Sequence, residues 1–310
     1  MKEKNIVFMG TPDFAVPILE MLIEVSNVVM VVTQPDKEVG RKKIISKSPV
    51  KKIAEENNIM VFQPERIRND YEELVGLNID LIVTCAYGQI VPQEVLDLPK
   101  YGAINVHASL LPKYRGSAPI QWSLINGDKE TGVTLMYMDK GMDTGDIIVK
   151  KSCAIDNSDN VGTLHDKLSL LGRDLLKENL ERIINQTVKR IKQNNDEATL
   201  APMIKREDEH LDFNSEGRSI INKIRALSPW PLANFLLNDQ EIKVIDAEFR
   251  TKNNPKAGVA SEVNKDTLGI ECLDGIIYLK MIKPFGKKEM TIKDYLNGIN
   301  KEKILGRVVK

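Results

Sequence analysis

The first half of the chain alternates short apolar runs with longer stretches in which apolar residues recur at helical spacing. The short runs fit buried strands, and the stretches between them are long enough for crossover helices. This alternation predicts an α/β fold with a doubly wound, mostly parallel sheet. We expect strands at Ile6–Met9, Val28–Thr33, Ile79–Cys85, Ala103–His107, Val133–Met138 and Ile147–Cys153, and helices at Phe14–Glu24, Pro49–Asn57, Pro92–Leu96, Ala118–Ile125 and Val161–Asn185.

The pattern changes beyond Lys189. The stretch from Lys189 to Lys205 is polar and contains the run Gln193-Asn194-Asn195-Asp196, which predicts a connection between domains. A helix expected at Ser215–Ala226 then precedes short strands separated by turn signals. Such strands predict a small antiparallel β-barrel that is OB-like, that is, similar to the five-stranded barrels that bind oligonucleotides. We expect its strands at Ala233–Leu237, Ile242–Phe249, Gly258–Val263, Leu268–Cys272 and Ile276–Lys283.

Length and composition support two domains. A chain of 310 residues with a hydrophobic fraction of 42% can form a core in each of them. We divide it into a first domain at residues 1–189, a linker at residues 190–205 and a C-terminal barrel domain at residues 206–310. Three separated cysteines fit a reducing compartment, and neither a signal sequence nor an apolar run of membrane-spanning length is evident. We therefore expect a cytoplasmic protein without a membrane contact.

Charge is clustered although it cancels overall. The 44 basic and 44 acidic side chains balance, so the total charge indicates no nucleic-acid partner. However, the segment from Lys37 to Lys52 has seven cations and one acidic residue, and the segment from Lys280 to Lys310 has nine cations and three acidic residues, a net charge of +6 in each. Two such segments are as compatible with a partner that has a phosphate backbone as with ordinary solvated surface.

One candidate for chemistry is the polar pair Asn105 and His107 at the end of an expected strand. Alternating strand geometry points both side chains to the same side, where both could donate to one reacting oxygen. Ligands of doubly wound sheets also collect at the carboxyl ends of strands. A single histidine at a strand end is more often a structural residue, so this pair alone does not decide the function.

A second candidate is the acidic, glycine-containing loop from Asp139 to Asp146. A carboxylate such as Asp143 could orient and charge the imidazole of His107, although acidic turns are usually only solvated turns. His165 and His210 lie in other segments, so no metal-ligand spacing exists and we expect no metal. No serine lies in a nucleophile elbow. The pattern therefore favours direct transfer between two bound substrates.

The turn Gly10-Thr11-Pro12 follows the first expected strand and faces the expected ligand crevice. It lacks the other glycines of a dinucleotide-binding fingerprint, and the chain has no Walker loop, so redox and NTPase functions lose support. The turn is equally compatible with a wall of the substrate site and with a simple connection between a strand and a helix.

Several motifs together resemble the formyltransferase family that uses 10-formyltetrahydrofolate. Within that family, the basic loop and the C-terminal motifs are similar to the members that formylate methionyl initiator tRNA. The resemblance extends over nearly the whole chain. It rests on MGTPDFAVP at 9–17, QPD at 34–36, NVHASLLPKYRG at 105–116, MDKGMDTGD at 138–146, PWP at 229–231 and GKKEMTIKDYLNG at 286–298.

The resemblance implies the formyltransferase fold and transfer of formyl from 10-formyltetrahydrofolate to the amino group of methionyl initiator tRNA for translation initiation. The chain departs from the family at Lys42 and Leu232, where glycine is common. We expect a monomer in which the first domain is catalytic and the barrel binds tRNA. The implied catalytic residues are Asn105, His107 and Asp143, the implied folate-contacting residues are Ser109, Leu110, Leu111 and Pro112, and the implied tRNA-binding residues are Arg41, Lys42 and Lys43.

Three alternatives remain at this point. A formyltransferase for a small amine, such as a nucleotide sugar or phosphoribosyl glycinamide, would not need a tRNA-binding barrel. A related hydrolase would release formate from the folate, with water as the acceptor and the same three residues. A non-catalytic RNA-binding protein would use the barrel alone, but the coexistence of Asn105, His107 and Asp143 argues against it.

Overall fold

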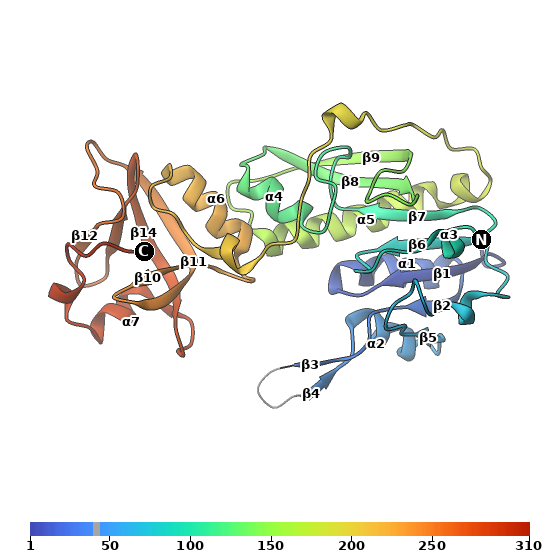
Figure 1. The fold of residues 1–310 in the computed structure, drawn as a ribbon, viewed down its shortest axis with the longest axis horizontal. Helices are drawn as coiled ribbons and strands as arrows, with labels where there is room; N and C mark the ends of the chain where they lie inside the picture. The colour runs from blue at the N-terminus through green and yellow to red at the C-terminus, as the bar shows by residue number, and fades with distance from the viewer. Residues whose placement is uncertain (40–43) are drawn as a thin grey trace. The chain divides into compact units, whose positions relative to one another are not determined.

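The computed structural model describes residues 1–39 and 44–310, which form two compact units (Figure 1). Unit 1 comprises residues 1–119, 130–154 and 165–202, and unit 2 comprises residues 120–129, 155–164 and 203–310. Two short segments of the expected first domain therefore belong to unit 2. In the described part of the chain, no helix is both long and apolar enough to cross a membrane.

Unit 1 contains a seven-stranded sheet with the order β5-β2-β1-β6-β7-β8-β9. The pairs from β5 to β7 are parallel, and β8 and β9 are added antiparallel at one edge. The predicted mostly parallel sheet is thus confirmed. Its strands are β1 (Asn5–Gly10), β2 (Asn27–Val32), β5 (Val61–Phe62), β6 (Leu81–Cys85), β7 (Ala103–His107), β8 (Glu130–Tyr137) and β9 (Ile147–Ala154).

Helices cover both faces of this sheet, as expected for a doubly wound fold. On one face, a Cβ at Gly172 of α5 would lie only 2.9 Å from Val106 of β7 and 3.7 Å from Ile18 of α1, so these elements pack closely. On the other face, Val95 of α3 shares a core with Val7 of β1. The helices of unit 1 are α1 (Val16–Val25), α2 (Pro49–Glu56), α3 (Gln93–Leu96) and, from residue 165 onward, α5 (Val161–Ile184). Residues 120–125 of α4 (Pro119–Ile125) belong to unit 2.

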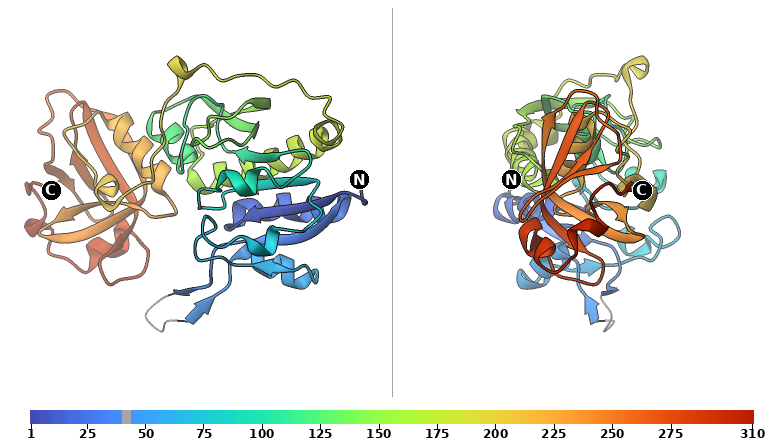
Figure 2. Two further views of the ribbon diagram at one scale, coloured as in Figure 1. Left: turned by 45° about the vertical axis from the view of Figure 1, so that its right-hand side comes forward. Right: turned by 90° about the vertical axis from the view of Figure 1, so that its left-hand side faces the viewer.

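The basic segment of unit 1 differs from the expected loop. β3 (Lys37–Val39) and β4 (Ile44–Ser46) pair antiparallel, with Lys37 opposite Ser46. Both views of Figure 2 show this hairpin projecting away from the sheet. Its strands have three residues each, and Ile45 is 69% exposed. Strands this short are not identified by hydrophobic periodicity.

Unit 2 is built around an antiparallel sheet in the order β10-β11-β14-β13-β12, with β15 paired to β14. All five expected strands are present. Asn238 and Asp239 both have positive φ, 51° and 59°, and form the tight turn between β10 and β11. The elements are α6 (Gly217–Leu227), β10 (Ala233–Leu237), β11 (Gln240–Thr251), β12 (Ala260–Val263), β13 (Leu268–Glu271), β14 (Gly275–Pro284), β15 (Met290–Thr291) and α7 (Ile292–Asn297).

Residues 306–310 close this sheet into a barrel. On one side, the Val309 N–H donates to the Gly258 carbonyl at 2.8 Å. On the other side, Leu236 of β10 and Lys310 exchange two backbone hydrogen bonds at 2.6 and 3.0 Å. Both edges of the sheet are therefore paired, and α6 packs over it through buried Ile220 and Ile224.

The polar stretch expected to be a linker is attached to unit 1. Ile191 and Ile147 exchange backbone hydrogen bonds at 2.8 and 2.9 Å, and the Ala201 N–H donates to the Arg115 carbonyl at 2.7 Å. A short 3-10 turn lies at Asn195–Glu197. Residues up to 202 therefore belong to unit 1. The linker expected at residues 190–205 between two domains stays a prediction.

Candidate active site

Asn105 and His107 lie at the end of β7, where the sheet changes from parallel to antiparallel. Thr84 of β6 is paired with Asn105 in the strand register. Its hydroxyl donates to Asn105 Oδ1 at 2.9 Å, and it also contacts the Ile104 carbonyl at 3.1 Å. Because Thr84 takes the amide oxygen, the Asn105 Nδ2 group is the part of the amide that is available to the site.

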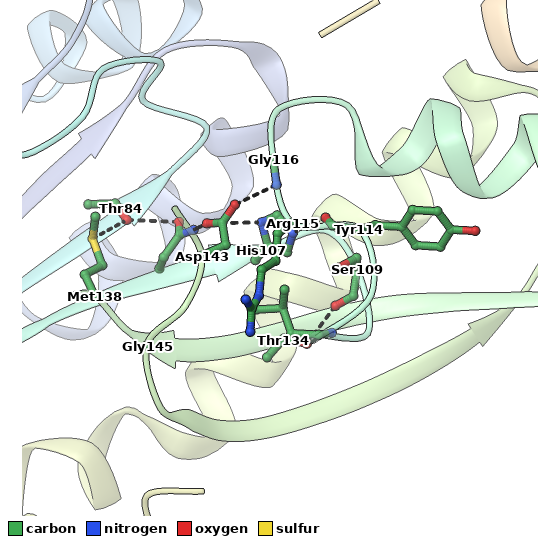
Figure 3. A network of polar contacts seen from close by, with 12 residues as sticks. Thr84, His107, Ser109, Tyr114, Arg115, Gly116, Thr134, Met138, Asp143 and Gly145 are labelled. Carbon is green, nitrogen blue, oxygen red and sulfur yellow. Dashed lines mark hydrogen bonds and ion pairs between the residues drawn. The ribbon is translucent and has the colours of Figure 1, made fainter. Parts of the chain in front are cut away.

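Asp143 lies in the loop between β8 and β9 and brings this loop to the end of β7 (Figure 3). Asn105 Nδ2 is 3.4 Å from Asp143 Oδ1, and His107 Nδ1 is 3.7 Å from the same oxygen. The two nitrogens thus converge on one oxygen atom. Both distances are long for hydrogen bonds, so the donors are not saturated by the carboxylate.

His107 is only 6% exposed, and it is held in a defined orientation. Its Nε2 lies 2.9 Å from the Tyr114 carbonyl oxygen. A carbonyl can only accept, so Nε2 carries a proton and Nδ1 faces Asp143. Both ring nitrogens therefore face acceptors, an arrangement in which the imidazolium form can donate from each of them.

The Asp143 side chain is fixed by a backbone group. The Gly116 N–H donates to Asp143 Oδ2 at 2.9 Å. Gly116 has φ of +127°, and a Cβ there would lie 2.5 Å from the Ala201 carbonyl oxygen. Only glycine fits this close approach, so the last residue of the KYRG sequence has a structural explanation.

The backbone of Asp143 is also held. Asp143 has φ of +53°, in the left-handed region that residues other than glycine rarely adopt. The Gln193 Nε2 group donates to the carbonyl oxygens of Asp143 and Gly145 at 2.9 and 2.8 Å. Arg115 in turn donates to Gln193 Oε1 from Nε and Nη2 at 3.1 and 2.8 Å.

Comparisons with known proteins identify the family of the chain. A sequence model described as "Formyl transferase" matches residues 4–180, more than half of the chain, and one described as "Formyl transferase, C-terminal domain" matches residues 203–300. This chain belongs to the formyl transferase family. The family resemblance inferred from the sequence motifs is therefore confirmed.

Two bacterial relatives and one solved structure extend this result. The chain is 48% identical to the methionyl-tRNA formyltransferase of Staphylococcus epidermidis (strain ATCC 12228 / FDA PCI 1200), covering 98% of this chain and 99% of the relative. It is also 48% identical to that of Staphylococcus aureus (strain MW2), covering 95% and 96%. The structure of an N-formyltransferase from Helicobacter canadensis, in complex with folinic acid and dTDP-3-aminofucose, has a TM-score of 0.67 and 25% identity, covering 91% of this chain and 100% of that one.

The segment Ser109–Pro112 of this formyl transferase follows β7. Ser109 and Leu111 are fully buried, and the Ser109 hydroxyl donates to the Lys113 carbonyl at 2.6 Å. Thr134 of β8 also binds the segment, since it donates to the Ser109 carbonyl at 2.7 Å. Leu110 and Pro112 are half-buried, so within this segment they retain exposed apolar surface.

The tRNA-binding residues expected at Arg41, Lys42 and Lys43 lie outside the described residues. Two of the neighbouring cations have acidic partners: Lys51 binds Asp36 at 2.7 Å and Lys47 binds Glu55 at 2.7 Å. The hydrogen bonds from Lys51 and Gln63 lower the pKa of the Asp36 carboxyl, which supports a stable pair. Part of the positive charge of this segment is therefore neutralised by acidic residues that lie outside it in the sequence.

Sequence reasoning did not single out Thr84, Gly116 or Gln193. Thr84 is the polar residue of an otherwise apolar strand, and this position could have indicated it. No local feature of the sequence indicates Gln193, because it contacts Asp143 across a separation of 50 residues.

In residues 1–39 and 44–310, no group of three or more histidine, cysteine or acidic side chains could hold a metal ion. Thr11 donates to the Tyr87 carbonyl at 2.9 Å and so connects the ends of β1 and β6.

Proposed function

We propose that this protein transfers the formyl group of 10-formyltetrahydrofolate to the amino group of methionyl initiator tRNA, which yields N-formylmethionyl-tRNA for translation initiation. Family membership and 48% identity over 98% of the chain support this activity. The observation that carries the catalytic assignment is the convergence of Asn105 Nδ2 and His107 Nδ1 on a single oxygen atom.

In the proposed reaction, Asn105 and protonated His107 stabilise the formyl oxygen. The methionyl amine attacks the formyl carbon, and negative charge develops on the oxygen as the new C–N bond forms. Two preorganised donors then act on this charge, and loss of one such donor typically reduces the rate by about 10²–10³. Thr84 supports this role because it holds the Asn105 amide with its Nδ2 group toward the site.

Asp143 is proposed to orient His107 and to move a proton. The attacking amine must lose one proton, and the folate nitrogen must gain one when its bond to the formyl carbon breaks. A carboxylate with one oxygen bound to the Gly116 N–H and the other near His107 has capacity left for this transfer. The reaction needs no redox change, because the formyl group keeps its oxidation state.

The folate is proposed to lie against Ser109–Pro112, the segment that follows β7. Flat ligands commonly bind apolar surface with few polar groups. Leu110 and Pro112 supply such exposed surface, whereas Ser109 and Leu111 shape the segment from within the fold. The Helicobacter canadensis enzyme forms a complex with folinic acid, which supports a reduced folate as the donor in this family.

The tRNA is proposed to bind through the loop with Arg41, Lys42 and Lys43 and through the C-terminal barrel. On the barrel, Lys287 and Lys288 are exposed and next to each other. We also propose that the protein is a monomer and that it is cytoplasmic, because translation initiation takes place in the cytoplasm. Light scattering that gives the mass of two chains would contradict the monomer.

One assay tests the proposed activity. The protein is mixed with 10-formyltetrahydrofolate and with methionyl initiator tRNA, free methionine or buffer, and formyl transfer is measured over a series of salt concentrations. We expect transfer only with the charged tRNA, and transfer should weaken with salt because tRNA binding releases counterions. Equal rates with free methionine would overturn the assignment, and formate release in buffer would indicate the hydrolase.

A formyltransferase for an amino sugar is the nearest alternative. The Helicobacter canadensis enzyme aligns with 91% of this chain, so the presence of a C-terminal domain does not by itself exclude a small acceptor. The assay therefore includes a dTDP-amino sugar as an acceptor. Transfer to this sugar at the rate seen with tRNA would favour the alternative, and a His107→Ala variant with normal turnover would contradict the shared mechanism.

A further inference from the structure

We propose that Gln193, oriented by Arg115, is a positioning residue that holds Asp143 in its active conformation. This inference rests on the proposed function, in which Asp143 acts on His107. Gln193 lies in the polar stretch between the two parts of the chain that the family models match, so its sequence context indicates only a connection. Its contacts indicate a role in the site.

The Gln193 amide is fully used. Nε2 donates to the carbonyl oxygens of Asp143 at 2.9 Å and Gly145 at 2.8 Å, and Oε1 accepts from two nitrogens of Arg115. A guanidinium can only donate, so Arg115 determines which end of the amide faces it. The amide nitrogen is thereby left to face the loop that contains Asp143.

Arg115 is well suited to set this orientation. It is only 7% exposed, and it also donates from Nη2 to Asn195 Oδ1 at 2.9 Å. Among the described residues it has no carboxylate partner within ion-pair distance, so its bonds go to neutral amides. A buried guanidinium fixed in this way cannot rotate freely, because lost hydrogen bonds would leave buried donors unsatisfied.

The backbone conformation of Asp143 is one that local hydrogen bonds stabilise. Its φ of +53° lies in the left-handed region, which residues other than glycine seldom adopt and which aspartate adopts when its polar groups are hydrogen-bonded. Gln193 binds its carbonyl, while Gly116, the neighbour of Arg115, binds its side chain. Residues 115 and 116 thus hold Asp143 at both ends, directly through Gly116 and indirectly through Gln193.

The first experiment replaces Gln193 and measures kcat and KM with methionyl initiator tRNA and 10-formyltetrahydrofolate. A displaced catalytic group costs about tenfold to a hundredfold in rate, so Gln193→Met should reduce kcat by this factor and change KM for the folate by less than about twofold. Gln193→Glu keeps the acceptor for Arg115 but loses the donors to the loop. It should therefore fold even if Gln193→Met does not, and it should show the same loss of kcat.

Asn194→Ala is the matched control. Asn194 is the exposed neighbouring amide, and it donates to Glu197 at 2.9 Å and caps the 3-10 turn at Asp196, without a contact to the Asp143 loop. If Gln193 only stabilises the local fold of this stretch, Asn194→Ala should lower kcat as much as Gln193→Glu. We expect Asn194→Ala to keep wild-type kcat, and equal losses in both variants would overturn the proposal.

A double-mutant cycle tests the path through Asp143. In an Asp143→Ala background, the Gln193→Glu substitution should change single-turnover rates by less than about twofold, because the residue that it positions is absent. The same loss in both backgrounds would overturn the positioning role. If Asp143→Ala alone turns over normally, the catalytic assignment of Asp143 fails instead, so the two failures are distinguishable.

Discussion

Asp143 in unit 1 and Glu271 in unit 2 are both carboxylates with little exposure, but their surroundings differ. Glu271, at the end of β13, is 4% exposed and binds the Lys252 ammonium and the Lys256 backbone N–H. Among the described residues, the Asp143 carboxylate accepts one short hydrogen bond, from a neutral backbone group, and has two long contacts. One carboxylate is saturated by its partners, and the other is not.

This difference distinguishes a carboxylate that stabilises the fold from one that is suited to proton transfer. Burial alone would raise the pKa of Glu271, but the hydrogen bonds from Lys252 and Lys256 lower it to about 2. A group so strongly held as an anion stabilises the barrel and cannot exchange protons near neutral pH. Asp143 keeps unsatisfied hydrogen-bonding capacity beside a histidine, which is what proton transfer requires.

The largest expected effect comes from Asp143→Asn. The amide retains an acceptor for the Gly116 N–H but cannot take up a proton or balance a charged His107. We expect kcat to fall by about 10²–10⁴, while the thermal unfolding temperature changes little. Steady-state kinetics at saturating substrates and calorimetry check this, and a large loss of stability would indicate that Asp143, like Glu271, is structural.

Glu271→Gln should give the opposite result, a loss of stability without a loss of turnover. The folded pKa of about 2 lies below the ordinary glutamate pKa of 4.5, so the contribution is complete above about pH 5 and disappears as the pH falls toward 2. We expect the variant to unfold with about 2–3 kcal/mol less free energy at pH 7.

Tryptophan fluorescence during urea unfolding measures this effect selectively, because both tryptophans, Trp122 and Trp230, belong to unit 2. The difference in the free energy of unfolding between the wild type and Glu271→Gln should decrease as the pH falls below 5. A gap that is independent of pH would mean that Glu271 contributes packing and not charge.

Gly116→Ala tests the short hydrogen bond from the Gly116 N–H to the Asp143 carboxylate. The new Cβ would meet the Ala201 carbonyl and require a positive φ, so we expect a loss of about 1–3 kcal/mol in stability together with reduced kcat. Gly76→Ala is the control, since Gly76 has φ of +91° and open space around its Cβ position. It should show only the smaller backbone cost, and equal losses in both variants would argue against the close contact.

The smallest expected effect concerns the barrel surface. Among the described residues, neither Lys287 nor Lys288 has an ion-pair partner, whereas Lys283 binds Glu289. Replacing both lysines with alanine should raise KM for the tRNA and reduce the slope of log KM against log salt by about two, without changing kcat. Lys265→Ala, an exposed lysine in the β12–β13 turn, is the control. An unchanged slope in the double variant would place the tRNA elsewhere.

Much of the fold could be predicted because its strongest signals are local. The apolar run at Ala103–His107 is a strand with the predicted bounds, and α5 extends over nearly all of its predicted range. The β3–β4 hairpin could not be predicted because its strands are too short to show a periodicity. The two-residue β5 could not be predicted because it is defined by its pairing with β2, which is distant in the sequence. Closure of the barrel by residues 306–310 also depends on contacts with Leu236, far away in the sequence.

The candidate site shows the same division. Strand geometry alone places Asn105 and His107 on one side of β7, and the glycine-containing loop around Asp143 was a reasonable partner for them. However, Asp143 is held beside them by contacts with Gly116, 27 residues away, and with Gln193, 50 residues away. No local pattern of the polar stretch marks Gln193, since its function depends entirely on what folds against it.

Alternation along the chain was therefore sufficient to predict the order of the longer strands and helices and the placement of the polar pair on one side of β7, and the residue identities were sufficient to indicate the family. The tertiary structure alone decided which polar and charged side chains have all their hydrogen-bond and ion-pair partners and which remain available for chemistry. Lys51 and Lys280, for example, count as free cations in the sequence but bind Asp36 and Glu248 in space. The physical reason is that hydrogen bonds and ion pairs act over a few ångströms, and only the tertiary structure brings residues distant in sequence within that range.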